Sequence, residues 1–515
     1  MPERPETPSS GALEAPRLGR GAWTTIVAVV VLVAGALVAN VVQRAHSSDS
    51  QEPPEPAVPG VVTNAVLFLV DDMSDFSCAE TRAYLPRSSE WLLDQGTCFE
   101  NATSSTPVCC PARAQIQTGQ FSHNNRVVSQ VAARNLEVRD TLQHDLGQIG
   151  IDTYGIGKNL NGITADQYFG PEAIDNGFAD FDFWNSYRGP AGTFKLYDDQ
   201  GRRYTPTTGL STTETNGAFL DTFLDAQLPT GRPFFVYDAF VAPHKQDVGF
   251  DAASLPPPSV AHADDPVPPF RWAPEGFDRD KLPIFQGQRF SRAYYERLWT
   301  AKVRALYDVD DQMADTFERL DEAGVLDQTA IIFTSDNGYT DRGQVNWEGK
   351  SIPYPAATDV PMLGWFPGRE PAVDDRPVAL IDVPATFYDV LDVVPGHQLD
   401  GHSLLSDHRR EFTYGEFYNE NSGLSRRESG PLASNLRSWR SVRQGDRAYV
   451  EWYGNGGDIV FTEFYDDPGM TKNLLAPVHR AQAPDPALVE SFRQTLQRLG
   501  TCQGTAQQGS PQPCA

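Results

Sequence analysis

Asn64–Asp72 reads NAVLFLVDD, an apolar run that ends in two adjacent carboxylates. A run this short, without polar alternation, is typical of a strand buried on both faces of a sheet. Three similar runs follow, each bounded by turn or helix signals, at Thr153–Ile156, Phe234–Tyr237 and Ala330–Thr334. Together with Val66–Val70 in the first run, they predict four buried strands.

Helical patterns separate these strands. The longest is Tyr294–Ala323, where apolar residues follow helical spacing and Gly324 supplies a C-terminal cap. Because strands and helices alternate, we predict an α/β fold with a large, mostly parallel (mixed) central sheet flanked by helices. Residues 251–293 are rich in proline and charge without a period, which predicts a long surface insertion.

The pattern changes near Glu411. Alternating apolar and polar runs, rich in Tyr, Trp and Val, predict antiparallel strands, and Pro486–Leu499 has a helical pattern. We therefore expect a smaller C-terminal α+β domain with an antiparallel sheet.

Residues 22–42, AWTTIVAVVVLVAGALVANVV, are uncharged and match the ~20 residues that a helix needs to cross a bilayer. Arg17 and Arg20 precede the run and Arg44 follows it, which favours a cytoplasmic N-terminus with the bulk of the chain outside. The alternative is a cleaved signal peptide, since residues 34–36 offer a small-residue cleavage site. The uncleaved helix predicts a single-pass protein of the cell membrane, and cleavage predicts a secreted one.

Residues beyond this run are rich in Pro, Glu and Ser, the composition of an extended tether. The expected division of the chain is a cytoplasmic segment 1–21, a transmembrane helix 22–42, a disordered linker 43–60, a main α/β domain 61–405, a C-terminal subdomain 406–500 and a tail 501–515.

Acidic residues outnumber basic ones by 68 to 42, giving a net charge of −26. Phosphate-backbone binding needs clustered Lys and Arg, so nucleic acid is not an expected partner. A negative surface also repels small anions at long range. Any anion site must therefore be a local concentration of cations, backbone N–H groups or metal.

Polar groups follow all four predicted strands. The short segments that come just past the strand ends are Asp71-Asp72, Gly157-Lys158, Ala242-Pro243-His244 and Asp336-Asn337-Gly338. In an open α/β sheet, ligands bind at the carboxyl ends of the strands. Four such loops at one edge predict a single functional site.

Asp71 and Asp72 cannot both ionise at the end of a buried strand without a counter-charge. A hard cation supplies one, and Asp336 with Asn337 would add a carboxylate and an amide oxygen. Calcium and magnesium prefer such oxygen ligands. The alternative for either pair alone is a loop-start carboxylate or a helix cap.

Cys109-Cys110-Pro111-Ala112-Arg113 precedes a stretch without a helix breaker until Gly119, which places Cys109 at a helix N-terminus. Free N–H groups and the helix dipole favour an anion there, and Arg113 can add a guanidinium. A thiolate is a soft ligand poorly matched to an oxygen-preferring cation, so Cys109 fits beside one only if its sulfur is replaced by oxygen. The alternative is a structural cysteine pair.

Six cysteines occur, at positions 78, 98, 109, 110, 502 and 514. None belongs to a paired CxxC zinc pattern, and export would place them where disulfides form. If Cys109 is modified and Cys110 is buried, the remaining four allow three pairings, of which we favour Cys78 with Cys98 and Cys502 with Cys514.

Cys-x-Pro-x-Arg followed by Thr118-Gly119 resembles the signature of the type I sulfatases, members of the alkaline phosphatase superfamily. Other blocks resemble family segments in the same order: Asn64–Asp72, Phe333–Gly338 (FTSDNG), Lys350–Pro361 (KSIPYPAATDVP), Ala379–Leu405 and Glu463–Asn473 (EFYDDPGMTKN). The resemblance implies an alkaline-phosphatase-like fold with residues 61–405 as the catalytic domain.

The resemblance further implies that a separate formylglycine-generating enzyme oxidises Cys109, and that the hydrate of formylglycine is the nucleophile. One calcium ion would be bound by Asp71, Asp72, Asp336, Asn337 and the modified Cys109. The implied catalytic groups are Cys109, Arg113, Lys158, His244 and Lys350. Without the resemblance, His244 would be a structural histidine and the two lysines solvated surface charges.

One segment departs from the family pattern. Many sulfatases have Lys-x-His where this chain has Lys158-Asn159-Leu160-Asn161, so a histidine is missing and Asn161 could replace it as a hydrogen-bonding group. This segment, the doubled cysteine and His123-Asn124 are most similar to the branch of N-acetylglucosamine-6-sulfatases and extracellular heparan sulfatases.

The expected function is hydrolysis of sulfate monoesters, on a sulfated sugar or glycan such as a glycosaminoglycan. In the implied reaction one hydrate oxygen attacks sulfur, and His244 or Lys350 assists the leaving alcohol. Two alternatives remain: a phosphonate or phosphodiester hydrolase on the same fold, and an inactive membrane-tethered binder of sulfated glycans.

Overall fold

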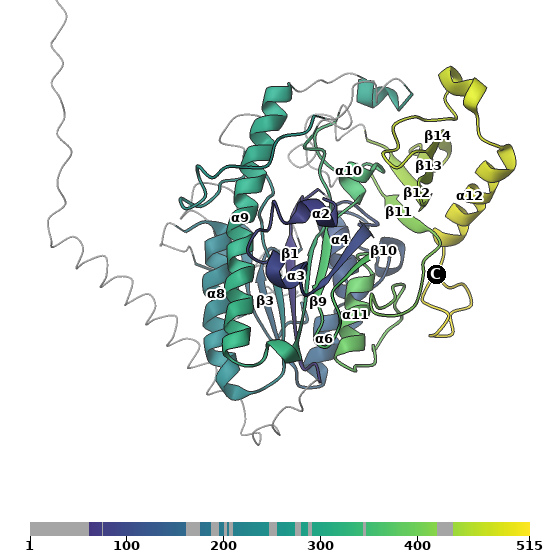
Figure 1. Cartoon of the computed structure of the whole chain (residues 1–515). Helices are drawn as coiled ribbons and strands as arrows, with labels where there is room; N and C mark the ends of the chain where they lie inside the picture. Colours follow the sequence, from purple (N-terminus) through teal and green to yellow (C-terminus); the bar gives the residue numbers. More distant parts are fainter. Residues whose placement is uncertain are drawn as a thin grey trace, which may run out of the picture.

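The computed structural model describes most of the chain beyond residue 60 (Figure 1). The described ranges are 61–74, 76–160, 176–186, 195–199, 203–204, 210–246, 255–272, 280–286, 291–342, 347–419 and 436–514. No helix within these ranges combines the length and the hydropathy of a membrane span. The segments predicted as a transmembrane helix and a linker, 22–42 and 43–60, lie outside them.

The four predicted strands are confirmed, each within two residues of its expected ends. They are β1 (Asn64–Val70), β3 (Asp152–Gly157), β7 (Phe234–Ala239) and β8 (Thr329–Ser335). They are neighbours in the order β8-β1-β7-β3 and pair in parallel, so their carboxyl ends meet at one edge. This edge is the one that the sequence predicts to carry a site.

Further strands extend this sheet on both sides, in the overall order β10-β2-β9-β8-β1-β7-β3-β4-β5-β6. The added strands are β2 (Thr97–Thr103), β4 (Asp180–Ser186), β5 (Lys195–Asp198), β6 (Arg203–Tyr204), β9 (Met362–Trp365) and β10 (Ala372–Ala379). β9 is antiparallel to β2 and β8, and β4, β5 and β6 run antiparallel in turn. The sheet is therefore mixed, with the parallel strands β8, β1, β7, β3 and β4 at the centre and a further parallel pair, β10 and β2, at one end.

Both faces of the sheet are covered by helices. Successive side chains of a strand point to opposite faces, so a central strand such as β1 contributes to two core clusters. From β1, Ala65, Leu67 and Leu69 join the core cluster that contains residues of α4, α6 and α11, whereas Val66 and Phe68 join the cluster with α8 and α9. Figure 1 shows α8 and α9 side by side along one face. The continuous apolar run of β1 follows from this two-sided burial.

The helices of this part are α2 (Cys78–Thr81), α3 (Ser89–Leu92), α4 (Cys109–Thr118), α5 (Ser122–Asn125), α6 (Leu142–Gln148), α8 (Thr212–Gln227), α9 (Arg292–Glu322), α10 (Pro355–Thr358) and α11 (Asp382–Val390). The longest, α9, is the predicted helix. Its N-terminus is capped by the Ser291 side chain, which accepts from Tyr294 N, and Gly324 lies just beyond its end.

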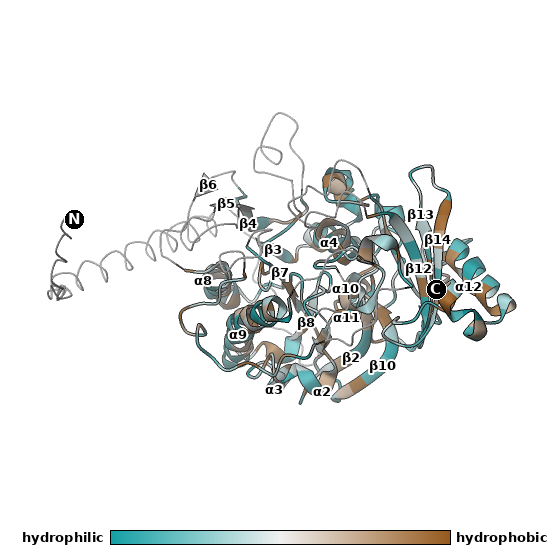
Figure 2. Cartoon of the chain, turned by 90° about the horizontal axis from the view of Figure 1, so that it is seen from above, coloured by the Kyte–Doolittle hydropathy of each residue, from teal (hydrophilic) through white to brown (hydrophobic). Residues whose placement is uncertain are grey.

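The C-terminal region has a separate antiparallel sheet of β11 (Thr413–Phe417), β12 (Ser438–Gln444), β13 (Arg447–Tyr453) and β14 (Ile459–Asp466). The predicted helix α12 (Pro486–Leu499) packs on it through Phe492, Leu496 and Leu499. Seen from above, this sheet and α12 stand beside the main layers (Figure 2). The predicted antiparallel α+β character of this region is confirmed.

The prediction of a surface insertion at 251–293 is wrong for the described residues 280–286. Lys281 and Phe285 are buried, and Lys281 Nζ donates to Tyr465 OH at 2.7 Å and to the carbonyl of Met470 at 2.9 Å. Aromatic side chains such as Tyr354 and Trp452 surround Phe285. This part of the segment packs between the C-terminal sheet and the loop that precedes α10, which its irregular composition does not reveal.

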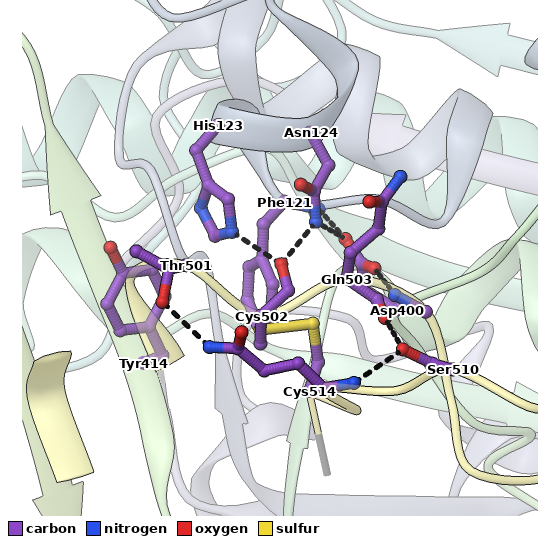
Figure 3. The surroundings of a disulfide bond; sticks show 12 residues. Phe121, His123, Asn124, Asp400, Tyr414, Thr501, Cys502, Gln503, Ser510 and Cys514 are labelled. Atoms are coloured by element: carbon purple, nitrogen blue, oxygen red, sulfur yellow. Dashed lines mark hydrogen bonds between the residues drawn. A yellow bond between two sulfur atoms is a disulfide. The ribbon is translucent and has the colours of Figure 1, made fainter. Parts of the chain in front are cut away.

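Two disulfides form as favoured from the sequence, Cys78–Cys98 and Cys502–Cys514, and Cys109 and Cys110 are free and buried. The second disulfide closes the tail against α5 (Figure 3). There the carbonyl of Cys502 accepts from Asn124 Nδ2 at 2.9 Å and lies 3.1 Å from His123 Nε2. His123 and Asn124 thus hold the tail on the main fold.

Candidate active site

The loops after the four central strands converge as predicted. Asp71 and Asp72 follow β1, Asp336 and Asn337 follow β8, Lys158 follows β3, and His244 lies a few residues beyond β7. Cys109 arrives from the N-terminus of α4, and Lys350 from the loop between β8 and α10. Every residue predicted as a metal ligand or catalytic group is described, and the structure brings them together.

Cys109 is the first residue of α4, as predicted. Val108 before it is extended, and the helix begins when Ala112 N donates to the Val108 carbonyl at 3.0 Å. Gln130 Oε1 accepts from Cys110 N at 2.9 Å, which satisfies one of the N–H groups that a helix start leaves without an intrahelical partner. All ten residues of α4 are buried, so the position of Cys109 is fixed by packing on every side.

Cys109 is 1% exposed, and its sulfur lies among charged groups. Lys350 Nζ is 2.7 Å from it, Lys158 Nζ 3.4 Å, and Asp71 Oδ1 3.6 Å. Burial, assisted by the charge of Asp71, raises the pKa of the Cys109 thiol to about 12. At neutral pH the unmodified side chain is therefore a thiol, which is a weak nucleophile.

Three carboxylates surround this point, and oxygen atoms of Asp71, Asp72 and Asp336 lie within 4.8 Å of one another. Burial raises the pKa of Asp336 to about 6, with Asp71 adding to the effect. Burial would also raise the pKa of Asp71, but the nearby cations, Lys158 foremost, hold it well below its usual value. The cluster concentrates negative charge where water is excluded.

Cations of the chain face the same carboxylates. Lys158 Nζ contacts Asp71, and Lys350 Nζ lies 2.5 Å from Asp72 Oδ1. Arg113 donates from Nε to Asp336 Oδ2 at 2.8 Å, and its Nη2 is 3.4 Å from Asp71 Oδ2. Buried ionised groups persist only when paired in this way.

The oxygen atoms fit a hard divalent cation. The Asn337 Nδ2 donates to Asp72 Oδ1 at 2.6 Å and to the carbonyl of Gly338, which leaves Asn337 Oδ1 buried without a hydrogen-bond partner in the described structure. An orphaned amide oxygen beside three carboxylates is a donor set that calcium or magnesium prefers. Cys109 Sγ, close to Asp71 and His244, is the one soft ligand atom among them.

His244 lies at the rim of the cluster with its Nε2 3.6 Å from Asp72 Oδ2. Its Nδ1 lies 2.5 Å from the Lys245 carbonyl and must donate to it, so the neutral ring carries its proton on Nδ1. Burial lowers the pKa of His244 to about 4, against the pull of Asp71 and Asp72. Neutral His244 can accept a proton or a hydrogen bond at Nε2.

At the histidine position of the Lys-x-His pattern this chain has Leu160, which is buried in the core cluster shared with β1, and the middle residue of the pattern is Asn159. It is buried, and its Oδ1 accepts from Gln117 Nε2 of α4 at 3.0 Å. Asn161, predicted to substitute for the missing histidine, lies outside the described residues.

Sequence reasoning missed a group of buried residues behind the site. Lys302 of α9 donates to the Asp72 carbonyl at 2.6 Å, and Lys245 pairs with Glu348 at 3.0 Å. A signal for Lys302 existed, because it lies between Leu298 and Leu306 at i+4 spacing, on the apolar stripe of its helix. A lysine on such a stripe is buried only when it is paired.

The family model described as Sulfatase matches residues 63–393, which is more than half of the chain and includes every residue named for the site. This chain belongs to the sulfatase family.

Curated sulfatases are about a quarter identical to this chain over the aligned residues. The N-acetylglucosamine-6-sulfatase of Homo sapiens is 25% identical over 494 residues, covering 86% of this chain and 85% of the relative. The extracellular sulfatase SULF-1 homolog of Drosophila melanogaster is 28% identical over 374 residues, covering 66% of this chain and 31% of the relative. This sulfatase spans about half, or less, of the length of two of the curated relatives that it matches.

Solved structures share the fold. The structure of BT4656 in complex with its substrate D-glucosamine-2-N,6-O-disulfate aligns with a TM-score of 0.67 at 18% identity, covering 85% of this chain and 97% of that one. The predicted α/β architecture with its antiparallel C-terminal sheet is confirmed, and this fold is shared with solved structures that include BT4656 and a phosphonate monoester hydrolase of Agrobacterium radiobacter.

Proposed function

We propose that this chain hydrolyses sulfate monoesters, with a nucleophile made from Cys109. The observation that carries the proposal is the setting of that residue: a buried helix N-terminus, two lysine Nζ atoms within 3.4 Å of its sulfur, and a carboxylate cluster beside it. A negative tetrahedral group needs such local cations and N–H donors because the whole chain carries a charge of −26.

One calcium ion is proposed to be held by Asp71, Asp72, Asp336 and Asn337, together with an oxygen on residue 109. The support is the orphaned Asn337 Oδ1 and the mutual distance of the carboxylate oxygens, within 4.8 Å. Bound there, the ion would polarise a sulfate oxygen and favour ionisation of a hydroxyl on residue 109. Sulfur at that position fits the ion poorly, which supports conversion of Cys109 to formylglycine by a separate enzyme.

Formylglycine would supply, as its hydrate, two hydroxyl groups on one carbon, one to attack sulfur and one to expel sulfate afterwards. Arg113, fixed by Asp336 and by the carbonyl of Lys158, orients residue 109 from one turn along α4. Lys158 and Lys350 bind the sulfate oxygens and offset the charge that develops on them. His244 or Lys350 delivers the proton to the departing alcohol oxygen. Because His244 is neutral with no proton on Nε2, it must first take up the proton that it delivers.

The proposed substrate is a sulfated carbohydrate. Support comes from the glucosamine disulfate in the solved complex and from the N-acetylglucosamine-6-sulfatase relative. Two disulfides favour an extracytoplasmic location for the folded part, reached through residues 22–42 either as an uncleaved membrane helix or as a cleaved signal.

Mass spectrometry of the peptide that carries Cys109 tests the proposal, with aldehyde expected in place of thiol. Cys109→Ser is expected to reduce turnover of an aryl sulfate by at least about 10³-fold, as for loss of other nucleophiles. Cys110→Ser, a change of the neighbouring buried thiol, is the matched control and keeps turnover. Intact thiol with binding but no sulfate release would identify a glycan binder instead, and faster cleavage of a matched phosphonate ester would identify a phosphonate hydrolase.

A further inference from the structure

Lys302 lies behind the proposed metal site, on a different element from the ligands. It is on α9, 4% exposed, and its Nζ donates to the Asp72 carbonyl at 2.6 Å and to Asp341 Oδ2 at 2.7 Å. Its ammonium group also lies 4.6 Å from the centre of the Tyr339 ring. A buried ammonium that donates one of its three hydrogen bonds to a backbone carbonyl fixes the orientation of that peptide.

The peptide that it fixes has an unfavourable conformation. Asp72 has φ of 64°, in the left-handed region that side chains other than Gly rarely adopt. Surrounding contacts keep it there: Asp72 N donates to Asp336 Oδ1 at 3.3 Å, and Met73 N donates to Ser335 Oγ at 3.1 Å. Lys302 provides the contact on the carbonyl side.

The same ammonium joins the loop after β1 to the loop after β8. Asp341 Oδ2 accepts from Lys302 and from Ser74 Oγ at 3.1 Å, and Ser74 Oγ also lies 2.5 Å from the Tyr339 carbonyl. Each loop carries two of the proposed ligands, Asp71 and Asp72 after β1 and Asp336 and Asn337 after β8. In addition to the pairing of β1 with β8, contacts that converge on one helix residue therefore link the two loops.

We propose that Lys302 is a positioning residue for the cation site: it holds the left-handed Asp72 peptide so that the Asp72 carboxylate faces Asp336 and Asn337. The proposal rests on the calcium site of the proposed function. Without the ammonium, the Asp72 peptide relaxes towards an ordinary conformation, and its carboxylate turns away from the other oxygens.

Calcium affinity of the purified chain provides the test, measured as the calcium concentration that gives half of the maximal thermal stabilisation. Lys302→Met is expected to raise this concentration at least ten-fold, and saturating calcium is expected to restore most of the turnover. Lys281→Met is the matched control, because it removes another buried lysine that donates to a backbone carbonyl, that of Met470. The calcium concentration that half-saturates Lys281→Met should stay within about three-fold of the wild-type value, because effects of distant substitutions on the site are small.

Two more variants separate positioning from charge neutralisation. Asp341→Asn keeps the contact from Lys302 to the Asp72 carbonyl and should bind calcium nearly as the wild type does. The double variant Lys302→Met/Asp341→Asn avoids leaving a bare buried carboxylate, folds even where the single variant does not, and should still bind calcium weakly.

The outcomes are distinct. Wild-type affinity in Lys302→Met, or recovery of affinity in the double variant, overturns the positioning role and leaves the calcium site standing. Absence of any calcium stabilisation in the wild type overturns the proposed site itself.

Discussion

Gly157, the last residue of β3, offers a sharp test of how the site is built. Its φ is 83°, and a Cβ added there would lie 2.1 Å from the Ala239 carbonyl oxygen and 2.5 Å from Asn216 Nδ2. The same Ala239 oxygen accepts from Lys158 N at 2.7 Å. Alanine at this position must therefore push apart the two strand ends that place Lys158.

The expected loss of stability for Gly157→Ala has two parts. The left-handed conformation costs about 1–2 kcal/mol for a residue with a Cβ. Crowding against a backbone oxygen costs about 1–3 kcal/mol more, as in other overpacked cores. The sum is about 2–5 kcal/mol in the free energy of unfolding, and a displacement of Lys158 by about 1 Å would reduce turnover by about 10²-fold.

Gly150→Ala is the matched control. Gly150 has φ of 86°, but an added Cβ would have no described heavy atom within 4 Å. Only the conformational cost of about 1–2 kcal/mol applies there, and turnover should not change. Urea unfolding and aryl sulfate turnover of both variants decide the matter. Equal losses of stability in the two variants, with normal turnover in Gly157→Ala, would refute the reasoning.

Two further predictions concern buried ion pairs away from the site. The Arg410 guanidinium donates to both oxygens of the Asp382 carboxylate, at 2.7 and 2.8 Å. Arg410→Met leaves that carboxylate buried without its partner, so the free energy of unfolding measured in denaturant should fall by about 3–5 kcal/mol. A loss below about 1 kcal/mol would contradict this. Burial alone would lower the pKa of His123, but the Glu416 carboxylate 3.0 Å away raises this pKa above 6.5. The stability that the pair contributes is therefore complete below pH 6.5 and is lost as pH rises through the raised pKa. His123→Gln should therefore lower Tm more at about pH 6 than at about pH 9, and equal losses at both values would show that the charge of His123 is not involved.

The sequence was sufficient for the features that depend on local pattern. The apolar run before Asp71 predicts a two-sided buried strand, and the Pro after Cys110 predicts the helix that begins at Cys109. Both features depend on neighbours in the chain. Placing their polar ends at one edge needed only the rule that parallel strands share a direction.

Features that depend on distant parts of the chain were not predictable in this way. The left-handed Asp72 has its carbonyl hydrogen-bonded by Lys302, which is 230 residues away, and buried Lys281 is hydrogen-bonded to Tyr465 and Met470. No propensity of Asp or Lys encodes these conformations. They arise because a buried ammonium takes whatever oxygen atoms the packed fold presents.

The pairing of β1 with β8 also has a kinetic consequence. Asp72 and Asp336 are separated by 264 residues and become neighbours only when these two strands are in register. An ion that needs both carboxylates binds after most of the main sheet has assembled, so it gains nothing from early folding events. Calcium should therefore slow unfolding and protect the folded chain against proteolysis, while leaving the initial rate of refolding unchanged.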